Sequence, residues 1–207
     1  CADMPDNIIV VKDLHKHFGN VRALNGISLT VKQGEIVGVT GLMGAGKTAV
    51  GRALAQLCGV PFVDSDHEIE VAANMTVPEI FARDGEAFFR ARESEVINRL
   101  LKGGACVLST GGGAFLSHVN RDAISRYGVS VWLDADVELL WSRVKHRDTR
   151  PLLQTANPKA TLQSIYDARV SEYAKADVRV ACAPPVAIDQ MALRVAKALL
   201  ARPDVLE

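Results

Sequence analysis

Beyond residue 34, short continuous apolar runs alternate with longer stretches in which apolar residues recur every three or four positions. The apolar runs predict β-strands without a polar face, which is typical of parallel strands covered on both sides. These strands are expected at 35–40, 61–64, 105–109, 129–133 and 178–182. Helices are expected at 47–58, 66–74, 78–101 with a break at Gly85, 117–126, 136–145, 160–175 and 187–200. The alternation predicts one α/β domain, residues 35–207, in which a five-stranded parallel sheet lies between layers of helices.

Residues 1–34 do not follow this alternation. IIVVKDL, HFGN and VRALNGISLTV are typical of two strands joined by a turn. We therefore expect an N-terminal antiparallel β-hairpin, as a segment of its own, that packs beside the sheet. A hairpin that is misdocked or mobile is the alternative. The charged stretch 145–159 is expected to be a linker-like loop.

The composition excludes several classes of protein. The chain has 207 residues, 48% of them hydrophobic and 23% charged, with a formal net charge of zero, so no basic excess favours nucleic acid. Its four cysteines are widely spaced, which argues against a disulfide framework or a zinc site. No apolar run approaches the roughly 18 residues that span a bilayer, and no signal-peptide pattern is present. We expect a cytoplasmic protein that binds neither nucleic acid nor membrane.

The sequence GLMGAGKT at 41–48 matches the phosphate-binding loop pattern G-x-x-x-x-G-K-[ST]. A strand is predicted before it and a helix after it, as the motif requires. Lys47 is expected to reach the β- and γ-phosphates of ATP or GTP, and the Thr48 hydroxyl to bind Mg²⁺. The alternative is a plain glycine-rich turn. The backbone of the loop would surround the phosphates through Gly41, Gly44, Ala45 and Gly46.

Two carboxylates follow the second predicted strand, where it ends beside the phosphate loop. Of Asp64 and Asp66, one could hold a water of the Mg²⁺ shell, while the other could accept a hydrogen bond from an attacking hydroxyl. The alternative is that Asp66 only caps the helix that begins there.

Further candidates point to a small polar acceptor. Arg90 and Glu93 are three residues apart and share a helix face, although a solvated surface pair would have the same spacing. Arg169 lies on an apolar helix stripe, where a ligand carboxylate or a protein carboxylate could pair with it, or its head could reach water. Gly111, Gly112 and Gly113 follow the third strand and allow close approach of a ligand to the backbone, unless they form a flexible turn.

Arg143 and Arg150 flank the charged stretch KHRDTRPLL. A mobile segment that carries an arginine over the γ-phosphate would exclude water and stabilise the charge of transfer. An exposed charged loop is the alternative.

Taken together, these motifs resemble the shikimate kinase family of P-loop enzymes, over about residues 41–200. The resemblance is carried by GLMGAGKTAVGRALA, PFVDSDHEIE, IFARDGEAFFRARESE, STGGGAF, TRPLL and the helix with Arg169. It implies a three-layer P-loop fold, a monomer, and ATP- and Mg²⁺-dependent phosphorylation of shikimate, with Lys47, Asp66 and Arg150 as catalytic residues.

The resemblance also assigns the remaining residues. Lys47 and Thr48 resemble the ATP and Mg²⁺ residues, and Asp64 the aspartate that holds Mg²⁺ through water. Asp66 resembles the acceptor of the nucleophile's proton. Arg143 resembles an arginine near adenine, and Arg150 the arginine of a lid. The shikimate-binding set is Asp66, Arg90, Glu93, Gly111, Gly112, Gly113 and Arg169, in which Glu93 positions Arg90.

The front of the chain resembles a different family. VKDLHKHFGNVRALNGISLTVKQGEIVGVTG, within residues 8–40, is similar to the start of an ATP-binding cassette transporter subunit. In that family the aromatic before the turn glycine, here Phe18, stacks on adenine, although ordinary hairpin packing would also use a phenylalanine. The rest of the pattern of an ATP-binding cassette subunit is missing, since no LSGGQ-like signature follows. The sequence therefore predicts a splice of two P-loop proteins between Gly34 and Gly41.

The sequence is also compatible with two other functions. Another small-molecule kinase, such as a gluconate kinase, would share the phosphate loop, although Arg90 and Arg169 favour an acidic acceptor like shikimate. A chimera that binds nucleotide with little turnover would also fit.

In this sequence the loop CAPPVAID lacks a basic residue that some shikimate kinases carry on the adenine side.

Overall fold

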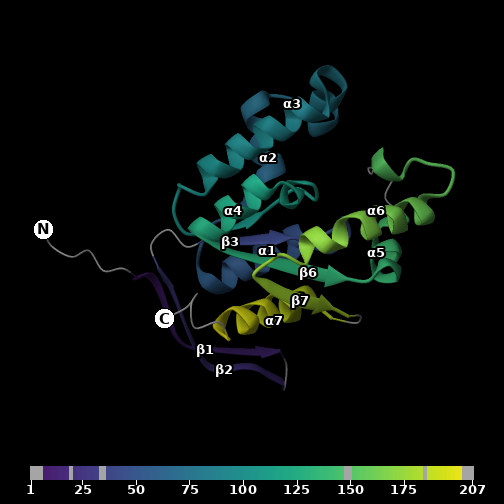
Figure 1. The fold of residues 1–207 in the computed structure, drawn as a ribbon. Coiled ribbons are helices and arrows are strands. Elements are labelled where there is room, and N and C mark those ends of the chain that lie inside the picture. The colour runs from purple at the N-terminus through teal and green to yellow at the C-terminus, as the bar shows by residue number, and fades with distance from the viewer. Residues whose placement is uncertain (1–6, 19–20, 33–35, 147–150, 184–185, 202–207) are drawn as a thin grey trace, which may run out of the picture.

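A computed structural model of the protein describes residues 7–18, 21–32, 36–146, 151–183 and 186–201. Five strands form one sheet in the order β4-β5-β3-β6-β7, and every neighbouring pair is parallel. Figure 1 shows this sheet in the middle of the molecule, between layers of helices. The strands are β3 (Ile36–Thr40), β4 (Phe62–Asp64), β5 (Cys106–Ser109), β6 (Gly128–Ala135) and β7 (Val178–Cys182).

Helices cover both faces of the sheet. Helices α1 and α7 contact each other on one face, α4 packs on β3 and β6 from the other, and α3 and α6 extend beyond it (Figure 1). The helices are α1 (Lys47–Cys58), α2 (Ser65–Ala73), α3 (Val77–Leu100), α4 (His118–Tyr127), α5 (Val137–Val144), α6 (Pro158–Tyr173) and α7 (Ile188–Leu200).

The predicted alternation is confirmed element by element, with ends that shift by at most a few residues. Gly85 breaks the helical geometry of α3, as predicted, since its φ of 79° and ψ of 173° lie outside the helical region. Two short 3₁₀ helices were not predicted, because three residues are too few to show a periodicity. They are η1 (Ala114–Leu116) and η2 (Pro151–Leu153), and the second lies inside the expected linker.

The predicted N-terminal hairpin is present. Strands β1 (Asn7–Phe18) and β2 (Val21–Lys32) pair with each other in antiparallel fashion. They form a separate two-stranded sheet, and β2 lies next to α7 (Figure 1). The hairpin therefore contacts α7 and adds no strand to the parallel sheet. The side chains of the hairpin lie outside the described part of the structure.

One apolar core joins the sheet to the helices on both faces. Leu54 on α1, Leu108 on β5 and Val131 on β6 are fully buried within it. A second, smaller cluster of Ile69, Ile80 and Phe89 holds α2 against α3. The β-strands thus present their carboxyl ends at one edge, and α2 and α3 form a separately packed arm beside that edge. Among the helices that the structure describes, none is both long and apolar enough to cross a membrane.

Candidate functional site

The phosphate loop lies between β3 and α1 and depends on three glycines. Gly41, Gly44 and Gly46 have φ values of 141°, 88° and 94°, which side-chain-bearing residues rarely adopt. A Cβ at Gly41 would also lie 2.9 Å from the Leu133 carbonyl oxygen. No side chain caps the N-terminus of α1. Its first amide groups and the positive end of its dipole are therefore available to an anion.

Two cationic side chains lie on this loop. Lys47 Nζ donates to the carbonyl oxygens of Gly41 at 3.0 Å and Leu42 at 3.4 Å. Arg143, from the last turn of α5, donates to the carbonyl oxygens of Gly44 at 3.1 Å and Ala45 at 3.3 Å. These contacts hold both cationic side chains against the loop. The loop therefore combines backbone amide groups with nearby cationic side chains, which suits a polyphosphate.

Thr48 and Asp64 meet at the first turn of α1. The Thr48 hydroxyl donates to Asp64 Oδ2 at 3.2 Å, and Asp64 Oδ1 accepts the Asp66 backbone N–H at 3.1 Å. Asp64 is therefore the N-cap of α2. The alternative that Asp66 only caps this helix is wrong, because Asp64 has that role and leaves the Asp66 side chain for other contacts.

The oxygen pair of Thr48 and Asp64 fits a hard cation such as Mg²⁺, which prefers oxygen ligands. Within the described ranges, no group of three or more His, Cys, Asp or Glu side chains could hold a metal by itself. This pattern suits an ion that takes its other ligands from substrate phosphates and water, as Mg²⁺ commonly does.

Asp66 lies in the first turn of α2, at the end of the α2–α3 arm that begins beside the sheet. A Cβ added at Gly111 would lie 2.5 Å from Asp66 Oδ1 and 3.0 Å from Glu93 Oε1, so all three residues adjoin. Burial raises the pKa of Asp66 and Asp64 raises it further, whereas Lys47 lowers it. Because the charge of Lys47 lowers the pKa of Asp66, the Asp66 carboxyl group lies within electrostatic range of the phosphate loop.

Arg90 and Glu93 form a pair that is held inside the protein. Arg90 Nη1 donates to Glu93 Oε2 at 2.8 Å, and Nη2 reaches Glu86 Oε1 at 3.2 Å. Glu93 is 1% exposed, so the alternative of a solvated surface pair is wrong. Its second oxygen, Oε1, is buried without a hydrogen-bond partner among the described residues. Burial raises the pKa of Glu93, although Arg90 lowers it. The Glu93 carboxylate therefore holds the Arg90 guanidinium in place.

The glycines after β5 come close to both Asp66 and Arg90. The Gly111 N–H donates to the buried Ser65 hydroxyl at 3.2 Å, and a Cβ at Gly113 would overlap the Arg90 guanidinium. These close approaches favour a tightly packed glycine turn over a loose one. We call residues 111–113 the glycine platform.

Arg169 comes to the same place from α6. It lies one helical turn before Tyr173, whose hydroxyl donates to the Gly112 carbonyl oxygen. Burial raises the pKa of Tyr173 to about 12, and both Arg169 and Arg90 lower it, so both arginines are near that hydroxyl. Asp66, Arg90, the glycine platform and Arg169 are thus brought together from four separate segments.

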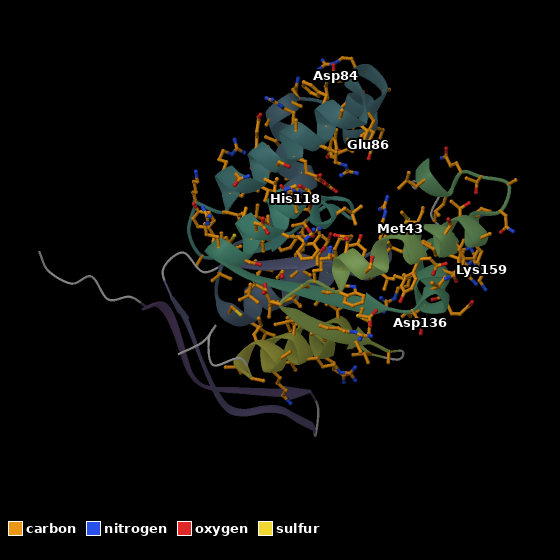
Figure 2. All side chains as sticks on the ribbon, viewed as in Figure 1. Met43, Asp84, Glu86, His118, Asp136 and Lys159 are labelled. Atoms are coloured by element: carbon orange, nitrogen blue, oxygen red, sulfur yellow. The ribbon has the colours of Figure 1, made fainter. Side chains whose placement is uncertain are left out.

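Two predicted site residues cannot be placed. Arg150 lies outside the described residues, and of Phe18 only the backbone, at the end of β1, is described. Figure 2 shows the side chains of the other elements, with Met43 of the phosphate loop labelled and Glu86 labelled on α3.

The sequence interpretation missed Ser65 and Tyr173 as contacts of the glycine platform. For Tyr173 a signal was available, since a tyrosine four residues after Arg169 lies on the same helix face. Ser65 gave no signal, because its contact with Gly111 spans 46 residues.

Comparisons with known proteins agree with this geometry. A sequence profile described as shikimate kinase matches residues 43–200. A shikimate kinase of Ruegeria pomeroyi is 65% identical over 169 residues, which cover 82% of this chain and 87% of that protein. One of Cereibacter sphaeroides is 56% identical and covers 88% of this chain and 92% of that protein. The solved structure of a shikimate kinase from Acinetobacter baumannii in complex with shikimate is 39% identical, with a TM-score of 0.76, and covers 81% of this chain and 93% of that one.

Proposed function

The chain belongs to the shikimate kinase family, and from this we propose that it transfers the γ-phosphoryl group of ATP to a hydroxyl of shikimate, which gives 3-phosphoshikimate and ADP. One observation supports this most strongly. A Cβ at Gly111 would lie 2.5 Å from Asp66 Oδ1 and 3.0 Å from Glu93 Oε1, and Glu93 holds Arg90 at 2.8 Å. The charge of Lys47 also lowers the pKa of Asp66. A hydroxyl that binds Asp66 would therefore lie near both the phosphate loop and a carboxylate-binding arginine.

The nucleotide end of this proposal uses the phosphate loop. The backbone of Gly41, Gly44, Ala45 and Gly46 would surround the β- and γ-phosphates. Lys47 would turn from the loop carbonyls toward the phosphates, and Arg143 would bind on the adenine side. Phosphoryl transfer has a loose transition state, so the protein contributes mainly alignment and charge stabilisation.

Thr48 and Asp64 would hold Mg²⁺, the first through its hydroxyl and the second through a water molecule. Their mutual contact of 3.2 Å supports this role, because one ion can be shared by oxygens that already adjoin. When bound, the ion neutralises charge on the phosphates.

The acceptor end would bind shikimate by its carboxylate and hydroxyls. Arg90 and Arg169 would hold the carboxylate, since a guanidinium binds a carboxylate through two parallel hydrogen bonds. Glu93 would keep Arg90 in position, and the glycine platform would lie against the ring. Asp66 would then orient the attacking hydroxyl and accept its proton. Its raised pKa favours the accepting step at the end of transfer.

Two further residues complete the proposal. Arg150 would act from a lid over the γ-phosphate, because TRPLL matches the lid segment of the family. Phe18 would stack on adenine if the N-terminal segment behaves like the cassette subunits that it resembles.

We also propose that residues 1–34 are a unit distinct from the kinase domain of residues 35–207, with an origin in an ATP-binding cassette protein. The hairpin forms a sheet of its own, apart from the parallel sheet of the kinase domain, which supports the division. Amide hydrogen exchange tests docking of the hairpin, since a docked hairpin should be protected and an undocked one should exchange rapidly throughout residues 8–31.

For the setting of the enzyme we propose a monomer in the cytoplasm. The described cysteines, Cys58, Cys106 and Cys182, are unpaired and buried, which suits a reducing compartment. Burial raises the pKa of each to about 11, so the thiols stay protonated and unreactive. The site described above is assembled within a single chain, which supports a monomer.

Steady-state release of ADP tests the proposed function. We expect release that depends on shikimate, with gluconate and water as poor acceptors. Gluconate-dependent release would favour a sugar-acid kinase instead. ATP binding without any acceptor-dependent release would favour a chimera that binds nucleotide but has lost transfer.

A further inference from the structure

The C-terminal end of α6 carries a buried tyrosine that contacts the glycine platform. Tyr173 is 2% exposed, and its ring stacks on Trp132 with centroids 6.3 Å apart and planes inclined by 21°. Its hydroxyl donates to the carbonyl oxygen of Gly112, across 61 residues of sequence. The ring is therefore fixed by packing and the hydroxyl by a hydrogen bond to the platform.

A run of three glycines needs such a contact to keep one conformation. Glycine has no Cβ and populates many backbone conformations, so the peptide planes of the platform can rotate easily. The N–H of Gly111 is already held by Ser65 at 3.2 Å. Tyr173 holds the next position, the Gly112 carbonyl. Because a trans peptide places C=O and N–H on opposite sides, this contact also fixes the direction of the Gly113 N–H.

The same tyrosine is linked to the arginine on its own helix. Arg169 and Tyr173 are four residues apart and share one face of α6. Burial raises the pKa of Tyr173 to about 12, so its hydroxyl stays a donor over the whole neutral range. Any shift of α6 would therefore move Arg169 and the contact with the platform together.

A second contact ties this end of α6 to the turn after the platform. Arg121 on α4 pairs with Glu172 at 2.7 Å and donates to the carbonyl oxygens of Phe115 at 2.7 Å and Leu116 at 2.9 Å. The end of α6 is thus connected both to the glycine platform, at Gly112, and to the residues that follow it.

We propose that Tyr173 is a positioning residue for the acidic substrate, which couples the placement of Arg169 to the conformation of the glycine platform. This inference rests on the proposed function, because it concerns the shikimate end of that site. Tyr173 acts through Arg169 and the glycine platform and does not itself contact the reacting atoms in this proposal. Its loss should therefore affect shikimate and leave the nucleotide unaffected.

The experiment compares Tyr173→Phe with Tyr166→Phe. The first removes only the hydroxyl and keeps the stacked ring. The second removes a hydroxyl from the same helix, where Asp134 and Arg179 are the neighbours and not the platform. For Tyr173→Phe we expect a loss of about tenfold in kcat/KM for shikimate, mostly through a higher KM, because a buried carbonyl is left unsatisfied. The KM for ATP and the Kd for an ATP analogue should stay within about twofold of the wild-type values.

The outcomes are distinguishable. Tyr173→Phe kinetics equal to those of Tyr166→Phe would overturn the positioning role. A parallel loss for shikimate and ATP, together with a lower Tm, would also overturn it, because that pattern indicates a general structural role. Wild-type protein without shikimate-dependent ADP release would instead refute the proposed function itself, whatever the variants do.

Discussion

The two ends of the site are built in opposite ways. The phosphate end is one contiguous loop, residues 41–48, whose conformation is fixed by glycines with positive φ and by the start of α1. The acceptor end has no local motif of this kind. Asp66, Arg90, the glycine platform and Arg169 come from four segments, which meet only because the sheet and α6 bring them together.

This difference explains how the two ends can change. A contiguous loop that binds phosphate works wherever a strand and a helix flank it, so it can serve many acceptors. A scattered acceptor site depends on how α2, α3 and α6 pack on the sheet. Substitutions at the two ends should therefore have separable effects on ATP and on shikimate.

The largest effect should come from the phosphate end. Lys47→Met removes the cation that lies over the loop carbonyls of Gly41 and Leu42. We expect kcat to fall about 10³-fold or more, because charge developing on the transferred group loses its stabilisation. Direct calorimetric titration with shikimate should still give wild-type affinity in the absence of nucleotide. Weakened shikimate binding in this variant would mean that the two ends are not independent.

The corresponding substitution at the acceptor end is Arg169→Ala. Arg169→Ala removes a guanidinium from α6 and should lower kcat/KM for shikimate roughly 10²-fold, since a charge-assisted hydrogen bond contributes up to about 3 kcal/mol. Binding of an ATP analogue should be unchanged.

Lys159→Ala is the matched control for that variant. Lys159 is an exposed cation on the same helix, paired with Glu138 at 2.7 Å (Figure 2). An exposed pair of this kind contributes little, so its kinetics should resemble those of the wild type. Near-normal shikimate kinetics in Arg169→Ala would remove that residue from the site.

A smaller loss is expected from crowding of the platform. In Gly111→Ala the new methyl would lie 2.5 Å from Asp66 Oδ1, so Asp66 or the loop must shift. Overpacking of this kind costs about 1–3 kcal/mol, and we expect roughly a tenfold loss in kcat/KM for shikimate. At Gly112 the nearest atom to an added methyl is 3.9 Å away, so Gly112→Ala should lose less. Equal losses in the two variants would argue against the close contact with Asp66.

The smallest effect concerns the pH dependence of stability. Burial raises the pKa of Glu93 above its usual 4.5, so the folded protein binds this proton more tightly than the unfolded chain does. The stabilisation is present below the unfolded pKa and is lost as pH rises through the folded one. The free energy of unfolding of the wild type should therefore fall, relative to Glu93→Gln, as pH rises above 4.5.

Urea titrations at several pH values measure this difference. Glu95→Gln serves as the control, since Glu95 is an exposed residue on the same helix, paired with Arg92 at 2.6 Å. Its stability should follow that of the wild type across the same pH range. If the free energy of unfolding of Glu93→Gln also follows that of the wild type across this range, the expectation of a raised pKa for Glu93 is wrong.

Much of the fold could be predicted from the sequence, because its elements are long enough to show their period. The five parallel strands and the seven α-helices of the described residues were found within a few residues, and so was the break at Gly85. The site of the hairpin could not be predicted. The contact of the hairpin with α7 depends on which surfaces the packed domain leaves uncovered, and no local pattern of residues specifies that.

The candidate site was predictable to a different degree at each end. The phosphate loop carries its information in eight neighbouring residues, whereas the role of Asp66 was ambiguous, because it could also cap the helix that begins there. The hydrogen bond from the Asp66 N–H shows that Asp64 is the cap, and the roles of both carboxylates in the reaction stay predictions. The contacts of Tyr173 with Gly112 and of Arg143 with Gly44 span 61 and 99 residues, and no local pattern specifies them.

Phosphorus NMR of a mixture of the protein, ATP, Mg²⁺ and shikimate tests the central claim most directly. If the two ends act on one reaction, a single phosphomonoester resonance should grow as that of the γ-phosphate of ATP disappears, and it should couple to one ring proton of shikimate. The appearance of inorganic phosphate alone, at a rate that shikimate does not change, would contradict the claim that the loop and the arginines serve one transfer.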